Sequence, residues 1–337
     1  MKSKRRILFV LKRHHYGPSY GLLNSCQFVA EALRSRGFEA KIAEVVDNNS
    51  VDREVAHYKP THVIVEALWV VPSKFPELLQ LHPEVQWIVR IHSNIPFLSG
   101  EGMAIHWLNE YRDIAARFDN FSVACNSRRM ASELELALGL DAAYLPNIYA
   151  DSLFHKPLVY TPERRRDSFI DIGCFGAIRP LKNQLEQAVA AVIFARATGR
   201  PLRFHVNSTR VEQNSDPILR NLIALFKSGE NEIVQHPWLP HNEFIEVLRR
   251  MDYGLQVSFS ETFNIVAADF VYNEIPFVGS REIEWLMPHS AADATNWESI
   301  VDRLCKSTDH HLMRTNKELL REFSEKALHD WLNYLAL

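Results

Sequence analysis

The chain has 337 residues, of which 47% are apolar and 23% are charged, and its formal net charge at pH 7 is −3. This length is too great for one small core and fits two domains of about 150 residues each. The nearly balanced charge excludes a protein whose whole surface binds nucleic acid. No window approaches about 18 consecutive apolar residues, so we expect no membrane-spanning helix.

The N-terminal basic residues precede an apolar run of only five residues, Ile7–Leu11. A secretory signal has a longer apolar core that ends in small residues, so we interpret this run as a β-strand. The four cysteines (Cys26, Cys125, Cys174 and Cys305) lie far apart and include no C-x-x-C pair. We therefore expect a reducing, cytoplasmic location and neither a disulfide framework nor a zinc site.

In the first half of the chain, short apolar runs alternate with amphipathic stretches. A first helix is predicted from about Gly21 to Arg36, because apolar residues recur there at helical spacing and Gly37 follows. Further elements are predicted as strands at 40–46, 61–67, 86–91, 121–124 and 142–145, and as helices at 103–117 and 129–138. Strands separated by helices are typical of a parallel sheet covered on both faces.

The pattern restarts after residues 151–168, which contain two prolines and a run of charges and are predicted to be a linker. Beyond it we predict strands at 169–175, 202–206, 232–235, 254–259 and 276–278, and helices at 181–198, 217–227, 242–251, 263–272 and 312–335. The predicted fold class is α/β, with two doubly wound Rossmann-like domains (1–150 and 169–315) facing across a cleft. The last helix, 316–337, is expected to return to the first domain.

Two loops of the first domain carry candidate binding groups. The loop after the first strand contains Gly17 and Gly21, and glycines there let backbone N–H groups approach an anion at a helix N-terminus. It is not G-x-G-x-x-G, so it predicts no dinucleotide site, and it can equally be a plain turn. His92 follows a buried strand and is either a satisfied loop histidine or a group that binds sugar hydroxyls in the cleft.

In the second domain, Gly176 follows a predicted strand, and Arg179 and Lys182 are predicted to open the helix that comes next. Cations at a helix start oppose the helix dipole unless an anion lies there, and a diphosphate is such an anion. A solvated helix start is the alternative. Glu261 and Asp269 follow the strand 254–259, and an acid within an apolar helix is costly to bury without a partner. A ribose, with its two neighbouring hydroxyls, could be the partner of Asp269. The alternative is that Glu261 is an acid near the start of the helix and Asp269 an exposed acid on its surface.

Together these motifs resemble the GT-B glycosyltransferases of family 4, which are retaining enzymes that use nucleotide sugars. The resemblance covers nearly the whole chain. It depends on motifs that occur in order: the glycine loop, His92, Asn126-Ser127, Leu145-Pro146-Asn147-Ile148-Tyr149…Phe154, Gly176…Arg179-x-x-Lys182-Asn183, and Glu261 followed eight residues later by Asp269.

The resemblance implies roles for individual residues. Arg179 and Lys182 are expected to bind the donor diphosphate and to stabilise charge on the leaving group. Glu261 is expected to hold the donor sugar near its anomeric carbon, and His92 to contact the sugar. The remaining donor-binding positions implied are Gly17, Gly21, Gly176, the backbone amides of Phe263, Asn264 and Ile265, and Asp269 for the ribose hydroxyls.

The chain departs from the family pattern at three positions. Asp269 stands where the family usually has glutamate, and Thr262 and Asn264 replace glycines, which puts the detailed phosphate contacts in doubt. No D-x-D triplet occurs, so we expect a metal-independent enzyme without a cofactor. The expected substrate is a nucleotide sugar, with a UDP-sugar as the first candidate. The histidine pairs at 14–15 and 310–311 have no partner ligands nearby in the sequence.

The expected reaction transfers a hexose-type sugar to a hydroxyl acceptor, either a saccharide or a lipid-linked glycan. Basic clusters near the N-terminus, at Arg128-Arg129 and at 164–166 raise hydroxymethylated DNA as a further acceptor, although solvated surface charge explains them as well. Two other functions remain open. A nucleotide-sugar epimerase can share the GT-B architecture, and a non-catalytic sugar-nucleotide-binding module would not depend on Glu261.

Overall fold

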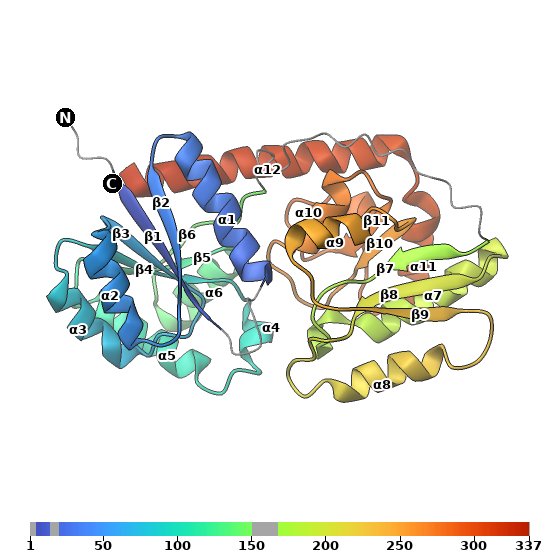
Figure 1. Ribbon diagram of the computed structural model, residues 1–337, viewed down its shortest axis with the longest axis horizontal. Coiled ribbons are helices and arrows are strands. Elements are labelled where there is room, and N and C mark those ends of the chain that lie inside the picture. The colour runs from blue at the N-terminus through green and yellow to red at the C-terminus, as the bar shows by residue number, and fades with distance from the viewer. Residues whose placement is uncertain (1–4, 14–19, 150–167, 337) are drawn as a thin grey trace. The chain divides into compact units, whose positions relative to one another are not determined.

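The computed structural model describes residues 5–13, 20–149 and 168–336 (Figure 1). Gly17, the His14-His15 pair and nearly all of the predicted linker lie outside these residues. The chain divides into two compact units, one formed by Met1–His155 with Phe323–Leu337 and the other by Lys156–Glu322. Each unit contains a six-stranded sheet in which every strand pair is parallel. The predicted α/β class with two Rossmann-like domains is confirmed, and the cleft stays a prediction.

The sheet of the first unit has the strand order β2-β1-β3-β4-β5-β6. Its strands are β1 (Arg6–Lys12), β2 (Glu39–Val45), β3 (His62–Glu66), β4 (Gln86–Ile91), β5 (Phe121–Cys125) and β6 (Ala142–Tyr144). Its helices are α1 (Tyr20–Ser35), α2 (Asn49–Tyr58), α3 (Phe75–Leu81), α4 (Ile95–Leu98), α5 (Ala104–Ala115) and α6 (Arg128–Leu138). The strand order reverses between β1 and β3, which makes this pair the switch point of the sheet.

Both faces of this sheet are buried, because alternate residues of each strand enter different cores. Leu8 and Val10 of β1 pack in a cluster with residues of α2, α3, α5 and α6. Ile7 and Phe9 of the same strand pack with α1 and with the end of α12 (His310–Ala336). Trp331 of α12 donates its indole N–H to the Pro146 carbonyl at 2.8 Å. This packing explains the continuous apolar runs of the strands, since neither face meets water.

The sheet of the second unit has the strand order β12-β11-β10-β7-β8-β9. Its strands are β7 (Ile170–Gly173), β8 (Leu202–Asn207), β9 (Glu232–His236), β10 (Tyr253–Gln256), β11 (Phe277–Ser280) and β12 (Ala291–Ala292). Its helices are α7 (Gln184–Thr198), α8 (Asp216–Leu225), α9 (His241–Leu248), α10 (Ile265–Tyr272), α11 (Trp297–Lys306) and the first part of α12. This is the order of a dinucleotide-type Rossmann sheet, with its switch point between β7 and β10.

Glycine at position 254 allows α10 to lie directly on β10. A Cβ atom added to Gly254 would come within 2.5 Å of the Phe270 ring, so no larger residue fits without displacing the helix. The opposite face of the sheet packs against α7, α8 and α11 in an apolar cluster that includes Ile172, Phe204 and Leu255. Within the described part of the chain, no helix is both long and apolar enough to cross a membrane.

Candidate active site

The loops that follow β7 and β10 carry several of the second unit's predicted site residues and bring Lys182 and Glu261 into contact. These two strands are neighbours at the switch point, and ligands of such sheets bind at the carboxyl ends of the strands there. Arg179 and Lys182 follow β7, and Glu261 follows β10. The backbone N–H of Phe259 donates to the Leu181 carbonyl at 2.9 Å and fastens the two loops to each other.

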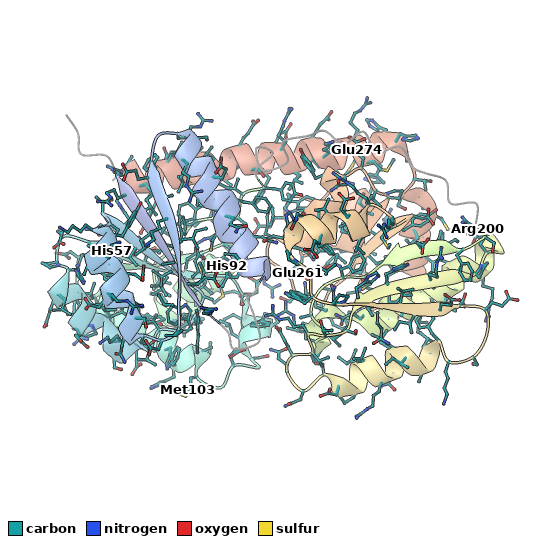
Figure 2. The ribbon with its side chains drawn as sticks, viewed as in Figure 1. His57, His92, Met103, Arg200, Glu261 and Glu274 are labelled. Atoms are coloured by element: carbon teal, nitrogen blue, oxygen red, sulfur yellow. The ribbon has the colours of Figure 1, made fainter. Side chains whose placement is uncertain are left out.

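Lys182 and Glu261 form an ion pair at this point. The Lys182 ammonium donates a hydrogen bond to the Glu261 carboxylate, and the two side chains are only 13% and 8% exposed. Figure 2 shows Glu261 in the second unit. Because so little water screens the pair, its attraction exceeds that of a surface salt bridge. The structure thus places a cation and a carboxylate side by side at the end of the central strands.

The prediction that Arg179 and Lys182 open a helix is wrong. Pro180–Lys182 form a 3-10 turn, and Asn183 then adopts a left-handed conformation with φ 56°, so α7 begins only at Gln184. The Asn183 side-chain amide donates to the Val257 carbonyl at 3.2 Å and to the Ala294 carbonyl at 2.7 Å, which fixes the break. The expected conflict with the helix dipole is therefore absent, because both cations precede the helix and both face carboxylates.

Arg179 faces Glu212, with Nη1 3.4 Å from Oε2. The same carboxylate binds Arg210, whose Nε lies 2.5 Å from Oε1. Upstream, Gly176 has φ 119°, a conformation that side chains rarely allow, and its N–H donates to Asn207 Oδ1 at 2.9 Å. The glycine at 176 is therefore required by the turn after β7.

Asn264 organises the start of α10. The helix begins at Ile265, two residues later than predicted, because Asn264 has φ 56° and caps it by accepting a hydrogen bond from the Ala267 N–H at 3.0 Å. The Asn264 amide also donates to Gln256 at 3.1 Å, at the end of β10. Asparagine tolerates the left-handed region better than other non-glycine, non-aspartate residues, which explains how a residue with a side chain can occupy this position. Phe263 is buried, and its carbonyl accepts the Trp285 indole N–H at 2.9 Å.

Asp269 of α10 is 1% exposed and has a protein partner that sequence reasoning missed. His241, the first residue of α9, places Nε2 2.8 Å from Asp269 Oδ1. Burial disfavours the charged imidazole, but the Asp269 carboxylate outweighs it and raises the pKa of His241 above its usual value. The costly buried acid is thus at least partly compensated within the chain, so burial alone does not demand a ribose.

At the carboxyl edge of the first sheet, His92 belongs to a buried polar network. Its Nε2 is hydrogen bonded to Glu66, and Glu66 pairs with Arg90 at 3.1 Å. Arg90 also donates to the Leu145 carbonyl at 2.8 Å and to Asn147 Oδ1 at 2.5 Å. Burial and the Arg90 charge lower the pKa of His92, so the imidazole is neutral at pH 7. Figure 2 labels His92 in the first unit.

Glu66 and Arg90 were not predicted as site residues, although a signal was present. Each is a charged residue within an otherwise apolar strand, and such residues need a partner when buried. Of the predicted glycines of the first loop, only Gly21 is described. It lies in the first turn of α1, and no atom within 4 Å would obstruct a side chain there.

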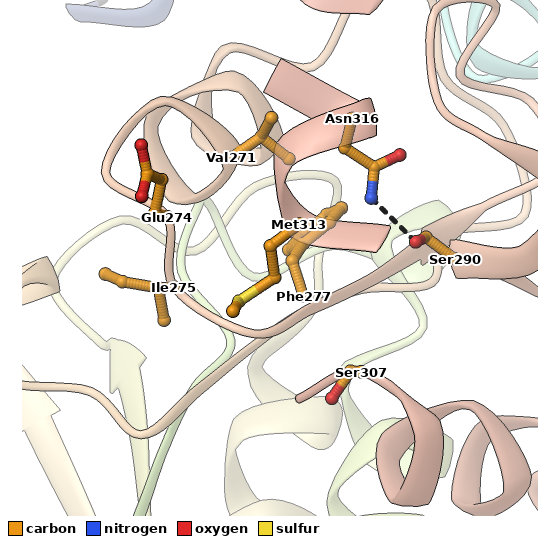
Figure 3. A pocket seen from close by; sticks show the side chains of 8 residues that line it. All are labelled: Val271, Glu274, Ile275, Phe277, Ser290, Ser307, Met313 and Asn316. Carbon is orange, nitrogen blue, oxygen red and sulfur yellow. Dashed lines mark hydrogen bonds between the residues drawn. The ribbon is translucent and has the colours of Figure 1, made fainter. Parts of the chain in front are cut away.

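Two further observations delimit the site. Among the described residues, no three histidine, cysteine, aspartate or glutamate side chains are grouped to hold a metal ion. Figure 3 shows a small pocket elsewhere in the second unit, beside the start of α12, where Asn316 donates to Ser290 Oγ at 2.7 Å. It is lined by side chains such as Val271, Phe277 and Met313 and contains none of the predicted site residues.

Neither protein-family models nor curated protein sequences gave a match to this chain. Solved structures do match over nearly the full length of both chains. Sucrose-phosphate synthase from Thermosynechococcus elongatus has a TM-score of 0.69 at 12% identity, covering 98% of this chain and 98% of its own. Anabaena HepE in complex with UDP and glucose has a TM-score of 0.68 at 12% identity, covering 98% and 99%. An α,α-trehalose-phosphate synthase (UDP-forming) from Burkholderia vietnamiensis has a TM-score of 0.69 at 10% identity, covering 98% and 96%.

At such low identity the likeness concerns the fold. It extends over both Rossmann-like units and the final helix, since 98% of this chain is covered in each case. The chain has the GT-B fold.

Proposed function

We propose that the chain is a glycosyltransferase that moves a hexose-type sugar from a nucleotide-sugar donor to a hydroxyl acceptor. The observation that carries the proposal is the Lys182–Glu261 pair at the switch point of the second sheet. A cation beside a carboxylate suits a sugar diphosphate, because the diphosphate needs positive charge and the sugar hydroxyls need an acceptor. The matched GT-B structures, one of them in complex with UDP and glucose, support the same conclusion.

In this proposal Lys182 and Arg179 bind the diphosphate and stabilise the negative charge that builds on it as the glycosidic bond breaks. Glu261 accepts hydrogen bonds from the sugar hydroxyls. Asp269, held by His241 through one oxygen, receives the ribose hydroxyls. The capped start of α10 directs the N–H groups around Ile265 towards phosphate oxygens, which a helix N-terminus favours.

UDP is the first donor nucleotide to test, since two of the matched structures are named for UDP. Retention of the anomeric configuration is part of the proposal through the resemblance to family 4. It is checked by the anomeric proton coupling of the first product formed. A product with inverted configuration would overturn the assignment as a retaining enzyme, but the proposed transferase activity would still stand.

We propose a saccharide acceptor before hydroxymethylated DNA. Several described residues of the basic clusters are engaged by the protein itself, which weakens the argument for an anionic acceptor. Arg128 lies over the Tyr144 ring at 4.0 Å and 3.7 Å from Asp330, and Arg129 pairs with Glu133 at 2.9 Å. Arg6 likewise pairs with Glu39 at 3.3 Å.

The experiment measures nucleoside diphosphate release from UDP-, GDP- and ADP-sugars, with and without saccharide and hydroxymethylated-DNA acceptors. Wild type is compared with Lys182→Ala, Glu261→Ala and the control Lys74→Ala, which removes a partly buried lysine of the first unit that pairs with Glu77. We expect acceptor-dependent release that collapses in the first two variants only. Sugar interconversion without an acceptor would indicate an epimerase, and binding without turnover would indicate a binding module.

A further inference from the structure

Both cations of the proposed diphosphate site are already paired with carboxylates of the chain. Lys182 is bound to Glu261, and Arg179 faces Glu212 at 3.4 Å. A donor diphosphate would bring two further negative charges to the same cations. Because like charges repel strongly where water is partly excluded, each carboxylate competes with the diphosphate for its cation.

Of the two carboxylates, Glu212 is the one whose effect on diphosphate binding can be tested separately, because it is not proposed to hold the sugar or the ribose. Its backbone fixes it beside Arg179 through a short parallel bridge. The Ile178 N–H donates to the Arg210 carbonyl at 2.9 Å, and the Glu212 N–H donates to the Ile178 carbonyl at 2.9 Å. The loop after β8 therefore carries the carboxylate to the cation that follows β7.

The contacts of Glu212 are unequal. Its Oε1 is held by Arg210 Nε at 2.5 Å, whereas its Oε2 is 3.4 Å from Arg179. Arg210 in turn lies over the Trp238 ring at 4.9 Å, which fixes the guanidinium. The carboxylate is thus anchored on Arg210, and Arg179 can leave it without depriving Glu212 of a partner.

We propose that Glu212 is an internal counter-anion of the diphosphate site, which lowers the affinity for the nucleotide and thereby speeds release of the nucleoside diphosphate product. The inference depends on the proposed function and names the residue that sets the strength of its donor site. All three side chains are partly accessible, with Arg179, Glu212 and Arg210 24%, 26% and 29% exposed, so an incoming anion can reach them.

The opposite role makes the opposite prediction. If Glu212 served to hold Arg179 in its binding position, neutralising the carboxylate would release the guanidinium and weaken nucleotide binding. If Glu212 competes with the diphosphate, neutralising it strengthens binding. The sign of one affinity change therefore separates the two roles.

The experiment titrates the full chain with UDP by calorimetry at low salt. For Glu212→Gln we expect an affinity roughly tenfold higher than that of wild type, because one carboxylate charge is removed beside the diphosphate. The control Glu246→Gln removes a glutamate that is 63% exposed and paired with Arg249, and its affinity should equal wild type. In turnover, Glu212→Gln should show stronger product inhibition by UDP.

A second variant guards against misfolding of the first. Arg210→Gln leaves the Glu212 charge facing Arg179 alone, so UDP binding should weaken, and the weakening should be much smaller in the Glu212→Gln background. Unchanged or weaker UDP binding by a folded Glu212→Gln protein would overturn the counter-anion role while leaving the proposed function standing. Failure of wild type to bind UDP, GDP or ADP would overturn both.

Discussion

Glu66 and Arg90 stand directly opposite each other on the neighbouring strands β3 and β4, and their side chains form an ion pair at 3.1 Å with no exposed surface. Although burial opposes ionisation, the Arg90 charge, together with the hydrogen bonds from Arg90 and His92, lowers the pKa of Glu66 below its usual value. The pair therefore stays ionised at pH 7, and it fixes His92 at the carboxyl edge of the first sheet.

Replacement of Arg90 by methionine is expected to destabilise the protein by about 3–5 kcal/mol, because Glu66 would remain buried without its cation. The control Arg129→Ala breaks an exposed pair with Glu133 and should cost less than about 1 kcal/mol. Urea unfolding of both variants measures the difference. Equal and small losses would show that the buried pair does not need its arginine.

Asp269→Asn is expected to raise the KM for the donor roughly ten- to hundredfold with a smaller change in kcat, because a hydrogen bond to a charged group is lost in the donor complex. Asp302→Asn is the control, since Asp302 is an exposed acid of α11 that pairs with Lys306. Initial rates at varied donor concentration separate the two constants. A donor KM equal to wild type in a folded Asp269→Asn protein would remove Asp269 from the site.

Stability is expected to fall on mild acidification. Burial lowers the pKa of His62 in the first unit and of His236 in the second to about 4. An unfolded histidine titrates near 6.5, so between these values the unfolded chain binds more protons. The corresponding stability is complete above about pH 6.5 and is lost as the pH falls towards about 4.

Urea unfolding between pH 7.5 and pH 4.5 measures this loss. The double variant His62→Gln, His236→Asn should show a shallower decline over that interval than wild type. The same decline in both proteins would mean that other groups cause it.

Gly254→Ala is expected to destabilise the second unit by about 1–3 kcal/mol, since the added Cβ would meet the buried Phe270 ring at 2.5 Å. Gly102→Ala is the matched control, because no atom lies within 4 Å of a Cβ at that position. Thermal unfolding compares the two. A Gly254→Ala protein as stable as the control would show that α10 shifts freely on β10.

The contact between Lys182 and Glu261, which are 79 residues apart, could be anticipated from the sequence. Both follow strands of one parallel sheet, and the carboxyl ends of such strands share an edge. The start of α7 was misplaced because Asn183 breaks the helix in a left-handed conformation, which single-sequence periodicity does not reveal. The break depends on hydrogen bonds from the Asn183 side chain to carbonyls that are far away in the sequence.

The partners of the buried acids were harder to predict. His241 binds Asp269 because α9 and α10 lie together, and no pattern around either residue signals that contact. Glu66 and Arg90 were within reach, since each interrupts an apolar strand and their strands are neighbours. Predicting the pair requires the strand register, which only the folded sheet supplies.

The decisive measurement for sugar transfer is the rate of UDP release from UDP-glucose and related UDP-sugars at increasing concentrations of a saccharide acceptor. For wild type we expect a rate that rises with acceptor concentration and saturates, and for Glu261→Ala a rate lower by at least about a hundredfold. A release rate that does not depend on the acceptor concentration, or that is the same in wild type and Glu261→Ala, would contradict sugar transfer at this site.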